Sequence, residues 1–148
     1  MADITKTAAL CREIEVIENR HLALVTDEDI AAGDVIYVKS NGRAAKARAN
    51  AVGTAKIVGI ATRAAAAGTP VTALYHGRYA GWYLSGVDSN KTVYLSTATA
   101  GAIADAAATG TGNVVAAVGR VFAYTNPTAQ RYVFVDISLN ASDPVALS

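Results

Sequence analysis

A pattern of short apolar strands and turns occurs twice in this chain, and it limits the possible folds more than any other feature. Three strings of the first half recur in the same order in the second: "VIYV" at 35–38 and "TVYL" at 92–95, "IVGIA" at 57–61 and "AVGRVFA" at 117–123, "VTALY" at 71–75 and "YVFVDI" at 132–137. The offset is roughly 57 to 61 residues each time, which indicates two copies of one supersecondary unit. Coincidental spacing in a turn-rich β protein is the alternative, and it predicts the same fold class.

Each string is short, rich in β-branched residues and bounded by turn residues, as strands are. Asn41-Gly42 lies between two such strings and is a strong hairpin signal, because both residues tolerate the positive φ that a type I′ turn requires. Gly59 and Gly119 interrupt strands at corresponding positions, which indicates a bulge, a barrel corner or close approach of another backbone. We therefore predict an all-β fold, a small β-barrel or tightly curved β-sandwich built from two pseudo-repeats at about 31–83 and 88–138, with at most short helical turns.

The length of 148 residues suits one domain, which can bury roughly 70% of its unfolded surface. We expect residues 1–25 to form an N-terminal arm or a first strand, and residues 26–148 to form the β-domain. Hydrophobic residues make up 52% of the chain, but alanine inflates that share, so the predicted core is rich in small side chains.

The net charge of +1 comes from 13 basic and 12 acidic residues without a long run of one sign, so we expect no direct nucleic-acid partner. The basic residues between Lys39 and Arg48 are interpreted as the solvated face of a strand and its turn. Charges near the N-terminus interrupt any signal-peptide core, and no run of 18 apolar residues predicts a membrane span. We expect the chain to stay in the cytoplasm unless it leaves within a larger assembly.

No constellation of residues predicts catalysis. Cys11 is the only cysteine and His21 and His76 are the only histidines, and none has a partner at the spacing of a known motif. The acidic residues at 27–29, with Asp34 nearby, lack the spacing of a calcium loop and are interpreted as a solvated turn. We therefore expect no enzyme activity, no cofactor and no metal.

Two groups of residues are candidates for a partner interface. The string "GRYAGWYLSG" at 77–86 concentrates arginine and aromatic residues, which interface hot spots use and which can also stack on sugars, although the same rings could fill the core. The N-terminal arm could add a strand to an exposed sheet edge of a partner. The candidate residues are Ile4, Leu10, Ile14, Val16, Arg78, Tyr79, Trp82 and Tyr83.

Three strings, "AAGDVIYVKSNGRAAKA", "IVGIATRAAAAGTPVTALYHGRY" and "VYLSTATAGAI…GTGNVVAAVGRVFA", resemble head decoration, or capsid cement, proteins of tailed bacteriophages. The resemblance covers about residues 30–137 and contains no catalytic signature. It implies a virion structural protein on the capsid exterior, made in the host cytoplasm. Such a protein binds the lattice of the major capsid protein as a homo-oligomer, a dimer or trimer, and stabilises the head. The alternative is a receptor- or glycan-binding module of a phage tail fibre or adhesin.

Overall fold

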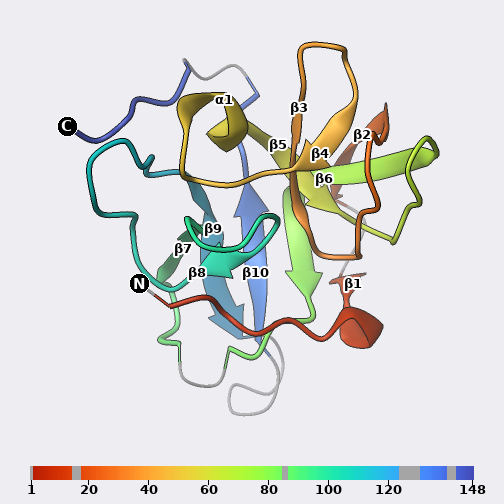
Figure 1. Cartoon of the computed structure of the whole chain (residues 1–148). Coiled ribbons are helices and arrows are strands. Elements are labelled where there is room, and N and C mark those ends of the chain that lie inside the picture. The colour runs from red at the N-terminus through yellow and green to blue at the C-terminus, as the bar shows by residue number, and fades with distance from the viewer. Residues whose placement is uncertain (1, 15–17, 85–86, 124–130, 140–142) are drawn as a thin grey trace.

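The computed structural model describes residues 2–14, 18–84, 87–123, 131–139 and 143–148. Its regular structure is nearly all β, which confirms the predicted fold class (Figure 1). The strands are β1 (Arg12–Ile14), β2 (Arg20–Val25), β3 (Val35–Val38), β4 (Ala44–Lys46), β5 (Ile57–Ala61), β6 (Pro70–Ala80), β7 (Thr92–Leu95), β8 (Ile103–Ala104), β9 (Ala117–Ala123) and β10 (Arg131–Asp136). The helical parts are short, a 3-10 turn at Ala8–Leu10 and α1 at Val52–Ala55.

The strands pair in the same way in both halves of the chain. The sheet order is β4-β3-β5-β6-β10-β9-β7-β8, so β3 to β6 of the first half take the places that β7 to β10 take in the second. Ile36 lies opposite Gly59, Val93 lies opposite Gly119, and the register shifts at the next residue in both pairs. The all-β fold is therefore built from two units with equivalent strand pairing.

The two strand glycines allow the next strand to come close. A Cβ atom on Gly59 would lie 2.8 Å from the carbonyl oxygen of Leu74, and one on Gly119 would lie 2.1 Å from that of Phe134. Leu74 belongs to β6 and Phe134 to β10, which are equivalent strands in the two units. Close backbone approach therefore explains both glycines, and a register shift accompanies each one.

The Asn41-Gly42 signal does mark the β3–β4 hairpin. The backbone N–H of Lys39 donates to the carbonyl of Arg43 at 2.8 Å, and the N–H of Gly42 donates to the carbonyl of Lys39 at 2.9 Å. Gly42 has a φ of 82°, whereas Asn41 is not among the residues with positive φ. The turn is therefore a type I turn followed by a left-handed glycine, and not the type I′ turn that requires positive φ at both residues.

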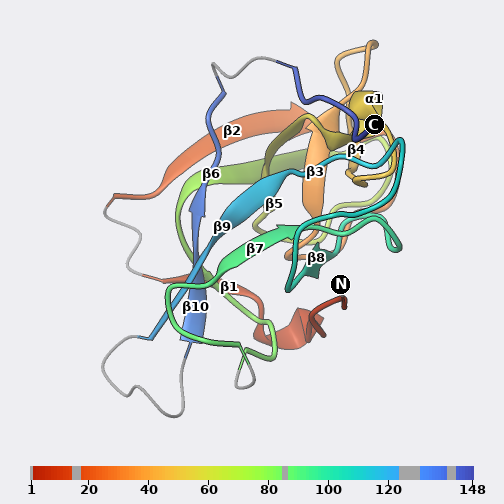
Figure 2. The ribbon, with the colours of Figure 1, turned by 90° about the vertical axis from the view of Figure 1, so that its left-hand side faces the viewer.

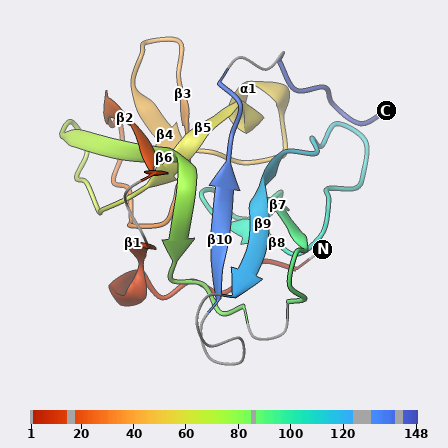
Figure 3. The ribbon, with the colours of Figure 1, turned by 180° about the vertical axis from the view of Figure 1, so that it is seen from behind.

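Strand β6 joins the two units because it pairs along both of its edges. Leu74 pairs with β2 and β5, His76 with β2 and β10, and Tyr79 with β1 and β10. A strand residue has one neighbour on each edge, so β2 and β1 line one edge while β5 and β10 share the other. Figure 3 shows the bend of β6 between its two halves, which curls the sheet into a half-barrel.

Both units contribute to one main core. Ile60 and Leu74 come from the first unit, Val93 and Val121 come from the second, and all four are fully buried. A smaller cluster that includes Ile36 lies beside it and contains Leu22 and Leu24 of β2, which runs along β6 (Figure 2). As the composition predicted, many buried positions are alanines: Ala44, Ala45, Ala47, Ala49, Ala55, Ala61, Ala73, Ala104 and Ala108.

Within the segment 1–25 that was predicted as an arm or first strand, residues 2–7 lie extended against the rest of the same chain (Figure 1). From here on, the name N-terminal arm refers to residues 2–7. The N–H of Ile4 donates to the carbonyl of Ile103 in β8 at 2.9 Å, and the N–H of Tyr83 donates to the carbonyl of Thr5 at 2.8 Å. β1 and β2 then follow as strands on β6. In this structure the N-terminal arm therefore extends the chain's own sheet.

Candidate partner-binding face

The structure separates the eight candidate interface residues. Ile4, Tyr79 and Trp82 are buried, Leu10 and Tyr83 are exposed, and Ile14 and Arg78 are half-buried. Val16 lies outside the described residues. Since Tyr79 and Trp82 are covered by their own chain, the string at 77–86 does not form an exposed aromatic surface.

Tyr79 is buried because alternate residues of β6 point to opposite faces of the sheet. Its ring packs edge-on against Trp82, with centroids 5.6 Å apart. Its hydroxyl donates to the carbonyl of Thr62 at 3.1 Å, and burial raises the pKa of Tyr79 well above its usual value. The residue that precedes it, Arg78, points to the opposite face, so sequence proximity to Tyr79 does not place the two side chains together.

Arg78 instead joins a row of side chains that runs across four strands. Ile14 of β1 lies opposite Arg78, Arg78 lies opposite Phe134 of β10, and Phe134 lies opposite Arg120 of β9. The neighbouring pairs on the other side of the sheet, such as Tyr79 and Val133, are fully buried. The row therefore lies on the outer side of the half-barrel, which we call the outer face.

Aromatic side chains fill the outer face between the two arginines. The guanidinium of Arg78 lies 5.9 Å from the ring centre of Tyr132 and 6.0 Å from that of Phe134, and the guanidinium of Arg120 lies 5.8 Å from that of Phe122. Phe122 and Phe134 pack edge-on at 6.3 Å. These distances are within the range of cation–π attraction, so the arginines and rings form one connected set.

His76 and Asp136 border the outer face at the bend of β6. The ring of His76 packs edge-on against Phe134 at 5.3 Å, and its Nδ1 lies 3.5 Å from a carboxylate oxygen of Asp136. Both residues belong to strands that the main core holds in place. The outer face therefore carries aromatic and charged side chains on strands that pack on the main core.

The sequence analysis placed Ile14 and Arg78 among the candidates but missed Phe122 and Phe134, which are half-buried on the outer face, and Tyr132, which is buried beside them. A signal for them was present, since "RVF" and "RYVFVD" alternate large aromatic residues with valines. Period-two alternation places Tyr132 and Phe134 on one face of a strand. Pairing of β9 with β10 then places Phe122 beside Tyr132, and no local pattern could have predicted this pairing.

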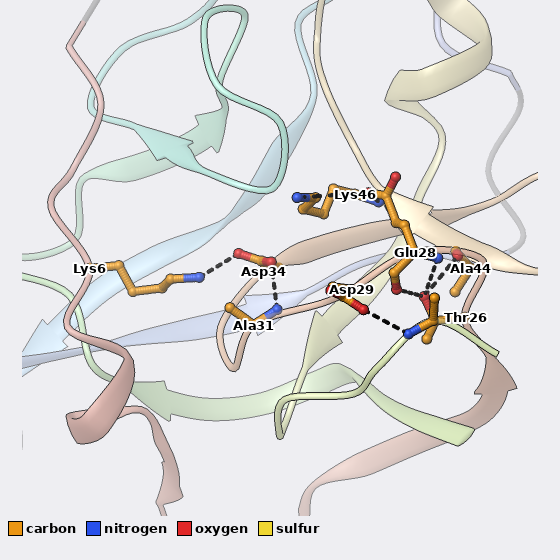
Figure 4. Close-up of polar contacts among 9 residues, drawn as sticks. Lys6, Thr26, Glu28, Asp29, Ala31, Asp34, Ala44 and Lys46 are labelled. Atoms are coloured by element: carbon orange, nitrogen blue, oxygen red, sulfur yellow. Dashed lines mark hydrogen bonds and ion pairs between the residues drawn. The ribbon is translucent and has the colours of Figure 1, made fainter. Parts of the chain in front are cut away.

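The acidic residues at 27–29 and Asp34 each bind donors of the protein itself. A carboxylate oxygen of Asp27 accepts from Lys39 at 2.7 Å, and one of Asp29 accepts from the N–H of Ala67 at 2.9 Å. Glu28 accepts from the N–H of Lys46 in β4 at 3.1 Å, as Figure 4 shows. These contacts agree with the interpretation of residues 27–29 as a turn, whereas Asp34 is buried and not solvated. Among the described residues no group of three or more potential metal ligands gathers in one place.

Three basic residues between 39 and 48 also contact acidic side chains or a carbonyl group of the same chain. Lys39 pairs with Asp27, and Lys46 lies 3.9 Å from Glu28. The Nε of Arg48 donates to the carbonyl of Thr97 at 2.8 Å. Because these three cations contact different neighbours, they do not form one basic patch.

Cys11 and His21 have separate surroundings. The Sγ of Cys11 lies 3.5 Å from the carbonyl oxygen of Thr7, and burial raises the pKa of its thiol. The Nε2 of His21 contacts a carboxylate oxygen of Glu13. A thiol with a raised pKa is a poorer source of thiolate, so Cys11 does not have the surroundings of an activated nucleophile.

An open groove of about 390 Å³ lies where β5 and β10 diverge from their shared edge of β6. Its lining is mostly apolar and includes the exposed side chains of Val38, Val115 and Leu139. Asp136 and Lys56 also line it, and Lys56 pairs with Asp143. The groove therefore exposes apolar side chains, and its two charged side chains are already paired, Lys56 with Asp143 and Asp136 with His76.

No protein-family model matches the chain, and no curated protein matches it. Of the helices within the described parts of the chain, none is long and apolar enough to cross a membrane.

Proposed function

We propose that this chain is a non-enzymatic structural protein of a bacteriophage virion, which binds the assembled capsid lattice and stabilises the head. The resemblance of about residues 30–137 to head decoration proteins supports the proposal. The surface that would meet the major capsid protein is the outer face. We also propose that the protein acts as a dimer or trimer on the capsid exterior.

The observation that carries the proposal is the row of Arg78, Phe134 and Arg120 on the outer face. Arginine and aromatic residues are enriched at the centres of protein interfaces, where they supply much of the binding energy. Here they stand on paired strands, so little backbone freedom remains to be lost on binding. Such a face suits a protein partner with a repeated, fixed surface.

On a capsid lattice, each single interface can have a low affinity, because one oligomer binds through several copies of it. Several copies of one weak interface, linked in an oligomer, can raise the overall affinity by roughly 10²- to 10⁴-fold without new contacts. A small β-domain can therefore bind a capsid firmly through several weak contacts. The glycan-binding alternative used Arg78 together with the rings of Tyr79, Trp82 and Tyr83. Of these three rings only that of Tyr83 is exposed, so we do not propose it.

The test is cosedimentation of the protein with empty, expanded capsids of a phage that carries this gene. Arg120→Glu reverses a charge on the outer face. Arg120 is exposed, and among the described contacts its guanidinium donates to the side-chain oxygen of Asn90 at 3.2 Å and lies over the ring of Phe122. We expect this variant to bind capsids at least about tenfold more weakly, because a like charge or an unpaired carboxylate at an interface costs more than 1.4 kcal/mol.

The matched control is Arg43→Glu, a charge reversal at an exposed arginine of the β3–β4 turn. It should bind capsids as the unchanged protein does, and both variants should melt at similar temperatures. If the unchanged protein ignores expanded capsids, the proposal is wrong. If Arg120→Glu binds as Arg43→Glu does, the assignment of the outer face is wrong.

A further inference from the structure

The N-terminal arm lies along the outer edge of β8, the last strand of the sheet. β8 ends the sheet order, and its pairing partner β7 lies on its other side. The arm pairs with β8 around Asp3 and Ala104, and then with the segment after β6 around Lys6 and Trp82. We call the edge of β8, residues 81–83 and Asp34 the arm seat.

The arm seat contains a buried carboxylate that requires a cation. Asp34 is only 7% exposed; one of its oxygens accepts from the N–H of Ala31 at 2.9 Å and the other pairs with Lys6 (Figure 4). The stem of Lys6 passes so close to Gly33 that a Cβ atom there would lie 2.8 Å from its Cδ. Since an unpaired buried charge is strongly destabilising, the seat is incomplete without a lysine from an extended segment.

Residues 8–11 connect the arm to β1, and none of them is buried. They include the 3-10 turn Ala8–Leu10, in which no side chain caps the N-terminus. The backbone bonds of this turn are local, from Leu10 to Thr7 at 2.9 Å and from Cys11 to Ala8 at 3.2 Å. The side chain of Leu10 is 65% exposed.

We propose that two copies of this chain exchange their N-terminal arms, so that the arm of each copy fills the arm seat of the other. Every backbone bond of the arm, the burial of Ile4 and the pairing of Lys6 with the partner's Asp34 would be retained. Exchange of identical elements is a low-cost route to a symmetric dimer, because it changes only the path of the connection. The exposed Leu10 lies in that connection, where the two crossing chains would cover it. The proposal does not depend on the virion function.

Mixed single-cysteine chains test the exchange directly. Asp3 lies opposite Ala104 in an antiparallel bridge, so Ile4 lies opposite Ile103. Opposite Cα atoms in such a pair are roughly 4.5–5.5 Å apart, a distance that a disulfide can span. One full-length chain would carry Ile4→Cys, a second full-length chain with a size tag would carry Ile103→Cys, and both would carry Cys11→Ser.

Neither chain can form this disulfide within itself. We expect the mixture, after incubation and mild oxidation, to give a heterodimer band of unique size on a non-reducing gel. The double variant with Ile4→Cys and Ile103→Cys in one chain reports that the geometry and the fold tolerate the cysteines. If the double variant closes its disulfide as a monomer at every concentration and the mixture gives no heterodimer, the exchange does not occur.

Lys6→Glu in the Ile4→Cys chain provides a matched control. It places a carboxylate against the partner's Asp34, and we expect the heterodimer yield to fall by about tenfold or more. Lys56→Glu reverses the charge of an exposed lysine outside the arm seat and should leave the yield unchanged. Equal yields from the two variants would show that the cross-link arises from random collision and would overturn the proposal.

Discussion

At the scale of single residues, the alternation of side chains along β6 separates structural from surface residues. Tyr79 is 0% exposed and hydrogen-bonds to the backbone, whereas Arg78 lies on the outer face. The string that contains both is rich in interface-type residues, but only alternate positions can reach a partner. Composition alone therefore overestimates the number of aromatic residues available for binding.

Tyr79 should make the stability of the protein depend on alkaline pH. Burial raises its pKa above the usual value, so the folded state keeps the phenolic proton at a pH where the unfolded state has lost it. Its contribution to stability is therefore fully present below about pH 10 and is lost as pH rises towards the folded pKa. We expect the free energy of unfolding to fall more steeply between about pH 10 and 11.5 in the unchanged protein than in Tyr79→Phe.

Urea denaturation at a series of pH values measures this difference. Tyr83→Phe is the control, because Tyr83 is 71% exposed and its replacement removes a hydroxyl in solvent. Its pH profile should follow that of the unchanged protein. Parallel profiles for Tyr79→Phe and Tyr83→Phe would contradict the buried state of the Tyr79 hydroxyl.

Gly119 should be intolerant of any side chain. A Cβ atom there would lie 2.1 Å from the carbonyl oxygen of Phe134, so β9 and β10 would have to move apart. We expect Gly119→Ala to reduce the free energy of unfolding by about 2 kcal/mol or more. Gly53→Ala is the control, because no atom lies within 4 Å of its Cβ position and alanine should stabilise α1 by about 0.5 kcal/mol. Equal stabilities of the two variants by urea denaturation would refute this packing argument.

At the scale of elements, the β3–β4 hairpin shows that a turn signal can be right in place and wrong in type. Asn41-Gly42 lies at the turn, but Gly42 alone has positive φ. The reason is the loop length, since Val38 pairs with Ala44 and leaves room for a type I turn and a bulge. The register between two strands depends on the sequences of both strands, so the dipeptide at the turn does not determine it.

Gly42 therefore provides a test of backbone strain without steric crowding. Its Cβ position has no atom within 4 Å, and its φ is 82°. We expect Gly42→Ala to lower the free energy of unfolding by about 1 kcal/mol, because an L residue in the left-handed region is strained. Gly42→Asn should lose less, because asparagine tolerates this region better. Thermal melting compares the three proteins, and an order with alanine above asparagine would contradict the turn type.

At the scale of the whole molecule, the two units depend on each other. β6 pairs with β5 in its first half and with β10 in its second half, and the main core takes residues from both units. The predicted repeat therefore describes strand pairing, but it does not describe two independent folding units. Most contacts also join residues far apart in sequence, which favours slow, cooperative folding.

A chain cut between the units should therefore not fold. We expect a fragment of residues 1–84 to be largely unfolded, because it lacks β10 and the valines of β9 that complete the main core. Circular dichroism and heteronuclear NMR of the fragment measure this, with the full chain as the reference. A cooperative thermal transition and dispersed amide signals in the fragment would show that the first unit is autonomous.

The strands, the two equivalent units and the small-residue core could be predicted from the residues alone, because period-two alternation, turn residues and Gly59 and Gly119 are local or repeated signals. The outer face could not. It forms only where β1, β6, β10 and β9 align, and that register comes from the bend of β6 and the packing of one core by both units. The same holds for the arm seat, since Lys6 and Asp34 meet only through long-range strand pairing, which no short stretch of sequence encodes.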